Sequence, residues 1–459
     1  MKNAKMSGKF HFIGIGGIGM SGLAQILLSQ GCEVSGSDLS VTPITESLVK
    51  AGAKIQLGQT SANVSEHFTV VYSSDIKPTN PEYMAALQLQ CPLWHRSDLL
   101  AYLMHARRGL AVTGTHGKTT TTALLAAVLV KAGLEPSYAI GGVVPEFQSN
   151  AAFGRGEFFI AEADESDGTF LKYFPQGAIV TNIDLDHMNH YETEDKLIAS
   201  FQQAMSQVAD KSHLLWCGDD LRLRQLEPEG ISYGFSPACD LIISGFQQSA
   251  WHVSFDMAFR GDIYEGITVN LSGRHNALNA AAVFGLALTL GISEGHIRAA
   301  LHAFSGVKRR CERKGEVQGV LFLDDYAHHP TEIQTTLQAI RQAVKGRRLI
   351  AVHQPHRYTR TRDCLGLYGS IFAAADMLFL TDIYGAGEAP IAGISSDLLL
   401  QEVAEQGSLA SCYCTRHQLA KKIAEYVQPG DVVVSLGAGD ITKLAQELMP
   451  LCDPSYSYA

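Results

Sequence analysis

A lysine and a threonine stand at a glycine turn between an apolar strand and a predicted helix. The segment "AVTGTHGKTTTT" covers residues 111–122, and Lys118 and Thr119 directly follow Gly117. Backbone amides at such a turn favour a phosphate group, the lysine can follow the outer phosphates of a nucleotide, and the threonine hydroxyl can bind Mg2+. The usual loop would place its first glycine at position 112, which is Val112. A Gly-Lys-Thr in an ordinary surface loop is the alternative, but the strand and helix on either side favour a shortened phosphate loop.

Two further polar residues follow apolar strands. Glu162 comes after "EFFIA" and His187 after "AIVTNIDLD". Because the carboxyl ends of parallel strands meet at one edge of an open sheet, we expect both to face the loop, where phosphoryl transfer needs metal ligands. The alternatives are a solvated glutamate and a histidine that is satisfied locally. The acids Asp164, Glu165 and Asp167 are less specific, since a short acidic run is often a solvated face.

The basic segment "HQPHRYTRTR", residues 353–362, is a candidate carboxylate-binding site. Such a segment is most often a solvated loop, and His353 with His356 could also indicate a metal. No carboxylate or cysteine stands at ligand spacing, which counts against the metal. Arg357 and Arg360 suit bidentate binding of a carboxylate.

Near the N-terminus, Gly14, Gly16 and Gly19 fit G-x-G-x-x-G, and Asp38 lies close to the distance at which an acid binds a ribose. The glycines also suit a purely structural strand-to-helix turn. A nicotinamide-dependent oxidoreductase would account for this turn but would leave residues 111–122 without a purpose.

The elements that position these residues alternate between strand and helix three times. At 459 residues the chain exceeds what one hydrophobic core usually serves. We expect an α/β protein with three domains, at residues 1–107, 108–313 and 314–459. The charged segment "SGVKRRCERKGEVQG" separates the last two.

Composition excludes some partners. A net charge of -10 argues against a basic footprint for nucleic acid. No apolar run is long enough to span a bilayer, so we expect no membrane insertion. The nine scattered cysteines favour a reduced cytoplasmic location over a disulfide framework. Nothing in the sequence indicates an oligomeric state.

Seven motifs occur in one order along essentially the whole chain: "GTHGKTTT", "EADESD", "NIDLDHM", "GRHNALNA", "GVKRR", "DDYAHHPTEI" and "HQPHRYTRT". As a set they resemble the Mur ligase family of peptidoglycan synthesis, in which the shortened ATP loop is the usual form. The resemblance implies a Rossmann-like N-terminal domain that binds a UDP-sugar. It also implies a central P-loop ATPase-type domain with a mostly parallel sheet, and a Rossmann-like C-terminal domain that binds the amino acid.

The resemblance also assigns roles to residues. ATP-binding residues would be Gly114, Thr115, His116, Gly117, Lys118, Thr119, Thr120, Asn276, Asn279, Arg310 and Asp325. Ligands of Mg2+, with Mn2+ as a substitute, would be Thr119, Glu162 and His187. UDP-sugar recognition would involve Gly14, Gly16, Gly17, Gly19 and Asp38. The amino acid would meet Tyr326, His328, His356, Arg357 and Arg360. Catalysis would depend on Lys118, Glu162, His187, His328, His356, Arg357 and Arg360.

The implied reaction joins L-alanine to the muramyl carboxylate of UDP-N-acetylmuramate. ATP would first convert the carboxylate to an acyl phosphate, and the amine would then displace phosphate. A recycling ligase that adds a whole tripeptide is the nearest alternative, and residues 353–361 are where the two would differ. A nucleotide-binding regulator without chemistry would not need the paired arginines.

Overall fold

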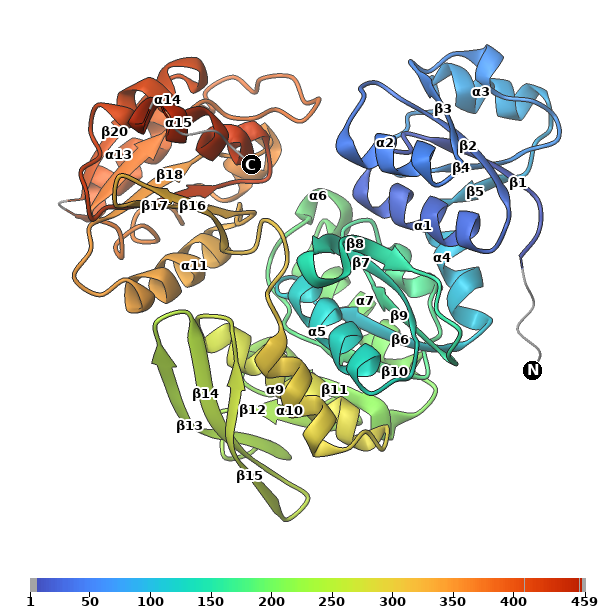
Figure 1. Cartoon of the computed structure of the whole chain (residues 1–459), viewed down its shortest axis with the longest axis horizontal. Coiled ribbons are helices and arrows are strands. Elements are labelled where there is room, and N and C mark those ends of the chain that lie inside the picture. Colours follow the sequence, from blue (N-terminus) through green and yellow to red (C-terminus); the bar gives the residue numbers. More distant parts are fainter. Residues whose placement is uncertain (1–5, 408, 454, 456–459) are drawn as a thin grey trace.

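The structure, a computed structural model, describes residues 6–407, 409–453 and 455. The predicted α/β class with three domains is confirmed, because the strands form three separate, mostly parallel sheets. In Figure 1 the N-terminal domain (blue) and the C-terminal domain (orange to red) stand on opposite sides of the central domain (teal to yellow). Among the described residues, no helix is long and apolar enough to cross a membrane.

The N-terminal domain is a five-stranded parallel sheet in the order β3-β2-β1-β4-β5. Its elements are β1 (Lys9–Ile13), α1 (Ile18–Ser29), β2 (Glu33–Asp38), α2 (Pro43–Lys50), β3 (Lys54–Leu57), β4 (Thr69–Tyr72), α3 (Pro81–Gln88), β5 (Leu93–His95) and α4 (Arg96–His105). The chain changes direction across the sheet between β1 and β4. In Rossmann-like sheets, ligands bind at the strand ends beside this point.

The central domain has ten strands in the order β15-β14-β13-β12-β11-β10-β6-β9-β7-β8. Its strands are β6 (Arg108–Thr113), β7 (Ser137–Val144), β8 (Ser149–Ala152), β9 (Phe158–Glu162), β10 (Gly177–Val180), β11 (Leu214–Cys217), β12 (Ile231–Gly234), β13 (Leu241–Ser249), β14 (His252–Phe259) and β15 (Asp262–Val269). Its helices are α5 (Lys118–Lys131), α6 (Met188–Tyr191), α7 (Glu194–Ser206), α8 (Leu221–Leu226), α9 (Arg274–Thr289) and α10 (Glu294–Ala303). The seven strands from β13 to β7 are parallel, and antiparallel strands extend the sheet at both edges.

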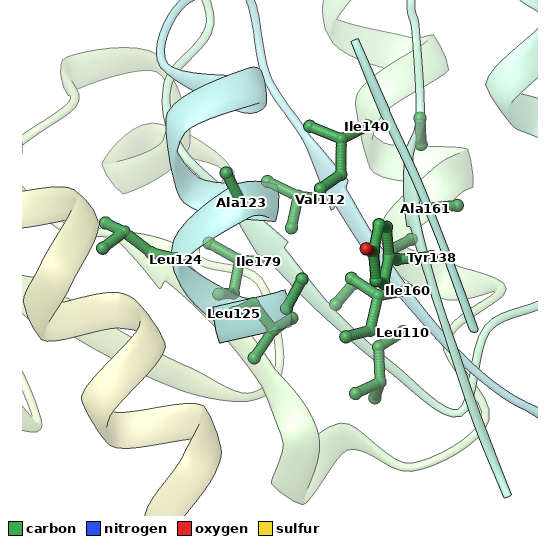
Figure 2. Packing of buried hydrophobic residues seen from close by; sticks show 14 of the residues in the cluster. Leu110, Val112, Ala123, Leu124, Leu125, Tyr138, Ile140, Ile160, Ala161 and Ile179 are labelled. Atoms are coloured by element: carbon green, nitrogen blue, oxygen red, sulfur yellow. The ribbon is translucent and has the colours of Figure 1, made fainter. Parts of the chain in front are cut away.

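The core of this domain fixes the start of the phosphate loop. Strand β6 lies between β10 and β9, so its apolar run is buried on both faces. Helix α5 packs over it, and Figure 2 shows Val112 of β6 beside Ile179 of β10 and Leu125 of α5, all fully buried. Each such side chain stabilises the fold by about 1.5–3 kcal/mol through burial. The loop between β6 and α5 is therefore anchored at both ends.

The hairpin of β13 and β14 was not expected from the sequence, and it joins two domains. In β14, buried and exposed residues alternate, as in a strand with one face on a core. At the hairpin tip, Trp251 packs against the hydrophobic core of the C-terminal domain. Gln248 beside it donates to the carbonyl of Ala339 at 2.9 Å.

Within the described residues, the C-terminal domain is a six-stranded sheet in the order β16-β17-β21-β18-β19-β20, in which β16 is antiparallel and the other strands are parallel. Its elements are β16 (Glu312–Val317), β17 (Val320–Asp325), α11 (Pro330–Ala343), β18 (Leu349–His353), α12 (Tyr358–Asp363), β19 (Met377–Leu380), α13 (Ser396–Gln406), β20 (Ala410–Tyr413), α14 (Arg416–Ala424), β21 (Val432–Leu436) and α15 (Leu444–Cys452). The domain boundaries at 107/108 and 313/314 stay a prediction. Strand β6 begins at the first boundary, and β16 spans the second.

Candidate active site

The loop after β6 needs its glycines. Gly114 has φ +130, and a Cβ there would lie 2.1 Å from the hydroxyl of Thr181. Gly117 has φ +83 and precedes the first residue of α5. The loop is held from the end of β10: Thr181 donates to the carbonyl of His116 at 2.6 Å, and the Asn182 side chain accepts from the His116 amide at 2.8 Å. The turn is thus set before any nucleotide arrives.

Lys118 is aimed back across this loop. Its Nζ donates to the carbonyls of Gly114 and Thr115 at 2.7 and 3.0 Å and lies 2.7 Å from Oε2 of Glu165. Burial raises the pKa of Glu165 to about 7, against the opposing pull of Lys118. Burial would lower the pKa of Lys118, but the surrounding carboxylates outweigh it and raise this pKa. Lys118 therefore stays charged.

The three predicted metal ligands divide into a pair and a single residue. The hydroxyl of Thr119 donates to Oε1 of Glu162 at 3.0 Å, and Oε2 of Glu162 accepts from the Gly141 amide at 2.7 Å. His187 has φ +59, and its Nε2 lies 3.8 Å from Glu165. Burial lowers the pKa of His187, which keeps a nitrogen lone pair available. The Thr119 hydroxyl and the Glu162 carboxylate are oxygen ligands of the kind that Mg2+ and Mn2+ prefer, and His187 offers one nitrogen as a third ligand.

The predicted adenine residues lie on α9 next to the loop. Asn279 donates to the side-chain oxygen of Asn276 at 3.1 Å, and a Cβ on Gly117 would lie 3.0 Å from Oδ1 of Asn279. Arg310, in the segment between the central and C-terminal sheets, reaches the Thr119 hydroxyl at 3.4 Å. Thr120 is buried in the first turn of α5. The structure brings these residues together around one loop.

Asp325, at the end of β17, has its oxygens engaged by backbone groups. One accepts from the Cys311 amide at 2.6 Å and the other from the Ala327 amide at 2.7 Å. Burial raises the pKa of Asp325 to about 6. The contacts fix the segment that enters the C-terminal domain, and a contact with the nucleotide stays a prediction.

The predicted amino-acid residues form an aromatic and basic cluster at the carboxyl ends of β17 and β18. The rings of His328 and His356 are 5.9 Å apart, and the ring of Tyr326 is 5.2 Å from that of His328. Nη1 of Arg360 lies 3.4 Å from Nδ1 of His356. Burial lowers the pKa of His328 to about 4 and that of His356 to about 3, so both rings are neutral at pH 7.

Two arginines of this cluster reach the other domains. Arg360 meets Asp186 of the central domain with two nitrogens, each at 3.3 Å. Arg357 lies 4.0 Å from Asp75 of the N-terminal domain. His353, by contrast, is fully buried in the C-terminal domain, with Nδ1 3.1 Å from the carbonyl of Leu436. The basic segment, residues 353–362, thus begins in the core at the last residue of β18 and continues into the site.

The N-terminal glycine turn is closed by Asp38. Oδ2 of Asp38 accepts from the Gly16 amide at 2.8 Å, and Gly14 has φ +76. Gly17 precedes α1, and Gly19 faces Arg96, whose Nη1 would lie 3.7 Å from an added Cβ. The carboxylate stabilises the turn itself, and a role in UDP-sugar recognition stays a prediction.

Sequence reasoning underrated the acids that follow β9. The sequence favoured a solvated acidic face, but the side chain of Glu165 is only 1% exposed and forms an ion pair with Lys118. Asp164 pairs with Arg96 of the N-terminal domain at 3.1 Å, and Asp167 accepts from Ser74. The available signal was position, because these acids directly follow the same strand as Glu162.

Comparison with known proteins matches the whole architecture. Three family models fit in order: the Mur ligase family catalytic domain at residues 9–108, the Mur ligase middle domain at 112–287, and the Mur ligase glutamate ligase domain at 309–439. The chain is 56% identical to a UDP-N-acetylmuramate--L-alanine ligase of Protochlamydia amoebophila over 98% of this chain and 99% of the relative. It is 44% identical to the enzyme of that name from an Anaeromyxobacter species, over 97% and 98% of the two chains.

Solved structures agree. The UDP-N-acetylmuramate-alanine ligase MurC of Thermotoga maritima matches with a TM-score of 0.84 and 25% identity over 98% of this chain and 100% of that one. A murein peptide ligase of Psychrobacter arcticus matches with a TM-score of 0.72 over the same shares. The three family models together match the chain between residues 9 and 439, and the relatives have nearly the same length. The chain therefore belongs to the Mur ligase family of ATP-dependent, amide-forming ligases.

Proposed function

We propose that this ligase joins L-alanine to the muramyl carboxylate of UDP-N-acetylmuramate, with release of ADP and phosphate, in peptidoglycan precursor synthesis. The observation that carries the proposal is the 56% identity, over nearly the full length of both chains, to a relative with this activity in its name. Because the reaction consumes ATP and a nucleotide-linked sugar, we infer a cytoplasmic location.

The ATP half of the reaction is supported by the loop after β6. Lys118 is largely buried, charged and hydrogen-bonded to loop carbonyls, which suits it to neutralise the outer phosphates. The guanidinium of Arg310 lies on the same loop, where it contacts the hydroxyl of Thr119. Transfer of a phosphoryl group to a carboxylate brings two anions together, so positioning and charge neutralisation are the main requirements.

Thr119, Glu162 and His187 would hold Mg2+, which when bound neutralises phosphate charge and aligns the oxygens of the γ-phosphate. The Thr119–Glu162 hydrogen bond places a hydroxyl and a carboxylate oxygen side by side, and burial favours the neutral form of His187. Removal of the Glu162 side chain would free the Gly141 amide as well as one ligand.

The acceptor half would lie at His328, His356, Arg357 and Arg360. The muramyl carboxylate oxygen attacks the γ-phosphorus, the bond to ADP breaks, and an acyl phosphate forms. The alanine amine then attacks the acyl carbon, loses a proton and expels phosphate. Arg360 has its Nε and Nη2 on Asp186 and its Nη1 beside His356, so a substrate carboxylate would bind to its remaining N–H groups or replace Asp186.

A general base for the amine is a separate hypothesis. His328 and His356 are both neutral at pH 7, so each has a lone pair for a proton, but pKa values of about 4 and about 3 make both weak bases in this arrangement. Substitution of each by Asn, followed by measurement of amide formation, tests the role. Unchanged amide formation would exclude that histidine as the base.

The tripeptide-adding alternative is not favoured. The murein peptide ligase has the lower TM-score of the two matches, 0.72 against 0.84, and the named full-length relatives add L-alanine. Both activities use the same ATP loop, so only the acceptor distinguishes them.

The deciding experiment is phosphate release from ATP and Mg2+ with UDP-N-acetylmuramate, with L-alanine, glycine, L-serine or the tripeptide added in separate reactions. We expect release that depends on L-alanine, with the mass of the alanyl product confirmed by mass spectrometry. The Lys118→Ala variant is the matched control for contaminating ATPase. Phosphate release that depends on the tripeptide alone would overturn the proposed acceptor. If none of the four acceptors supports phosphate release, the proposed reaction is wrong.

A further inference from the structure

A second group of metal-ligating side chains lies where the ATP loop meets the C-terminal domain. It consists of His116 in the loop, Asp184 after β10 and His329 at the start of α11, and one ligand atom from each lies within 4.8 Å of the others. Nε2 of His116 is 3.0 Å from Oδ2 of Asp184, and Nδ1 of His329 is 3.7 Å from the same oxygen. None of these residues belongs to the predicted Mg2+ ligands.

His329 is the unusual member. Its side chain is only 3% exposed and caps the first turn of α11 only loosely: it faces the Glu332 amide, but among the described residues neither ring nitrogen has a partner at full hydrogen-bond geometry. An unsatisfied buried polar group destabilises a fold, because its lost contact with water is not replaced. A buried imidazole that faces a carboxylate and a second imidazole, with its lone pair uncommitted, is arranged as a ligand is.

The groups around the cluster are those that orient metal ligands. Nδ1 of His116, the ring nitrogen on the far side from Asp184, lies 3.3 Å from Oε1 of Glu332. Asp184 accepts from the Leu185 amide at 2.8 Å and from the Thr331 hydroxyl at 2.7 Å. A carboxylate behind a ligating histidine fixes the ring orientation and makes the metal-facing nitrogen more basic.

We propose that His116, Asp184 and His329 bind a divalent transition-metal ion of the zinc class, and that this ion bridges the ATP loop and helix α11. Two imidazoles with one carboxylate suit Zn2+ and Co2+, whereas Mg2+ prefers oxygen ligands. In a tetrahedral site with bonds of about 2.0–2.1 Å, neighbouring ligand atoms lie about 3.3 Å apart. The separations of 3.0 and 3.7 Å bracket that value. The 3.0 Å contact is a hydrogen bond between His116 and Asp184, so binding of the ion would release this proton.

The ion would join parts of the chain that come from different domains. His116 is one residue from Gly117 at the start of α5, and His329 precedes the first turn of α11. A bound ion therefore holds the loop and the C-terminal domain in the arrangement described above. We expect micromolar Zn2+ to raise the melting temperature and to slow ATP turnover, since opening of the domains then requires loss of the ion. This inference does not depend on which amino acid the ligase adds.

The test is titration of the full-length protein with Co2+, without nucleotide or Mg2+, followed by visible absorption, and then displacement by Zn2+ in a calorimeter. We expect the wild type to bind one Co2+ ion, with a visible absorption band, and the His329→Gln variant to lack this band. The His187→Gln variant is the matched control and should keep the band, because His187 belongs to the predicted Mg2+ site. Glu332→Gln should weaken Zn2+ binding about 10- to 100-fold.

Circular dichroism checks that each variant is folded, and Asp184→Asn replaces His329→Gln if the latter is not. Loss of the band in His187→Gln but not in His329→Gln would assign the ion to the ATP-metal residues and overturn the proposal. Equal Zn2+ affinity in wild type and His329→Gln would also overturn it.

Discussion

The loop after β6 and the basic segment after β18 both follow parallel strands, but they are held differently. In the loop, Lys118 and Thr119 find their acidic partners, Glu165 and Glu162, inside the central domain. In the basic segment, Arg360 pairs with the central domain and Arg357 lies near the N-terminal domain. Lys118 and Thr119 are thus preorganised within one domain, whereas the two arginines of the acceptor half lie against other domains. Changes in the loop should alter chemistry directly, and changes in the segment should act through domain contact.

The largest effect is expected for Lys118→Ala. The substitution removes a largely buried charge from the phosphate site and leaves the buried Glu165 carboxyl group without this partner. We expect L-alanine-dependent phosphate release to fall about 10²- to 10³-fold, as for loss of a preorganised charge-stabilising group. Lys131→Ala, at the exposed end of the same helix, is the control. A fall below tenfold in Lys118→Ala would contradict a preorganised loop.

A double-mutant cycle on Arg360→Lys and Asp186→Asn tests the contact between the central and C-terminal domains. Both side chains are largely buried, and their bidentate geometry requires the guanidinium. We expect a coupling energy of about 0.5–3 kcal/mol, measured from kcat/KM for L-alanine. The KM for ATP should change less than that for L-alanine. Additive effects of the two changes would indicate that the acceptor half does not depend on this contact.

The pH dependence of stability tests the core part of the basic segment, His353. Burial lowers the pKa of His353 to about 4, compared with about 6.5 in an unfolded chain. Below pH 6.5 the unfolded chain binds a proton that the folded chain does not, so stability falls as the pH drops from about 6.5 to about 4. His353→Gln removes this contribution, and the free energy of unfolding should depend less on pH in that window. The measurement is urea unfolding at several pH values, with the exposed His417→Gln as control. An unchanged slope would mean that His353 does not titrate as a core residue.

The smallest effect is expected for Asp75→Asn. Asp75 is 86% exposed and 4.0 Å from Arg357, so the pair should contribute less than about 0.5 kcal/mol to the free energy of unfolding. Asp431→Asn is the comparison, because buried Asp431 binds Arg348 at 2.7 and 2.9 Å. That change should cost about 1.5–3 kcal/mol. A large decrease in the free energy of unfolding of Asp75→Asn would show that the N-terminal domain is bound to the basic segment more strongly than the exposure of Asp75 suggests.

Local pattern was enough to predict the glycine loop, since strand, turn and helix lie within one short segment. Mostly parallel sheets were likewise expected from the alternation of apolar strands and helices. Pattern does not predict pairs such as Arg360 with Asp186, which are far apart in sequence and come from different domains.

Burial of polar residues was equally hard to foresee. Glu165 and Asp164 are neighbours in one acidic run, yet Glu165 is sealed against Lys118 and Asp164 faces Arg96. His353 and His356 likewise stand in one segment, and only His353 enters the core. Composition treats each pair alike, whereas packing against distant segments decides which member is buried.

The hairpin tip that carries Trp251 has a practical consequence. Trp251 is one of three tryptophans in the chain. It belongs to the central domain and packs against the core of the C-terminal domain. Its indole would pass from an apolar to an aqueous environment when the two domains separate. Trp251 is therefore a built-in fluorophore whose emission wavelength reports that movement in real time, without any attached dye.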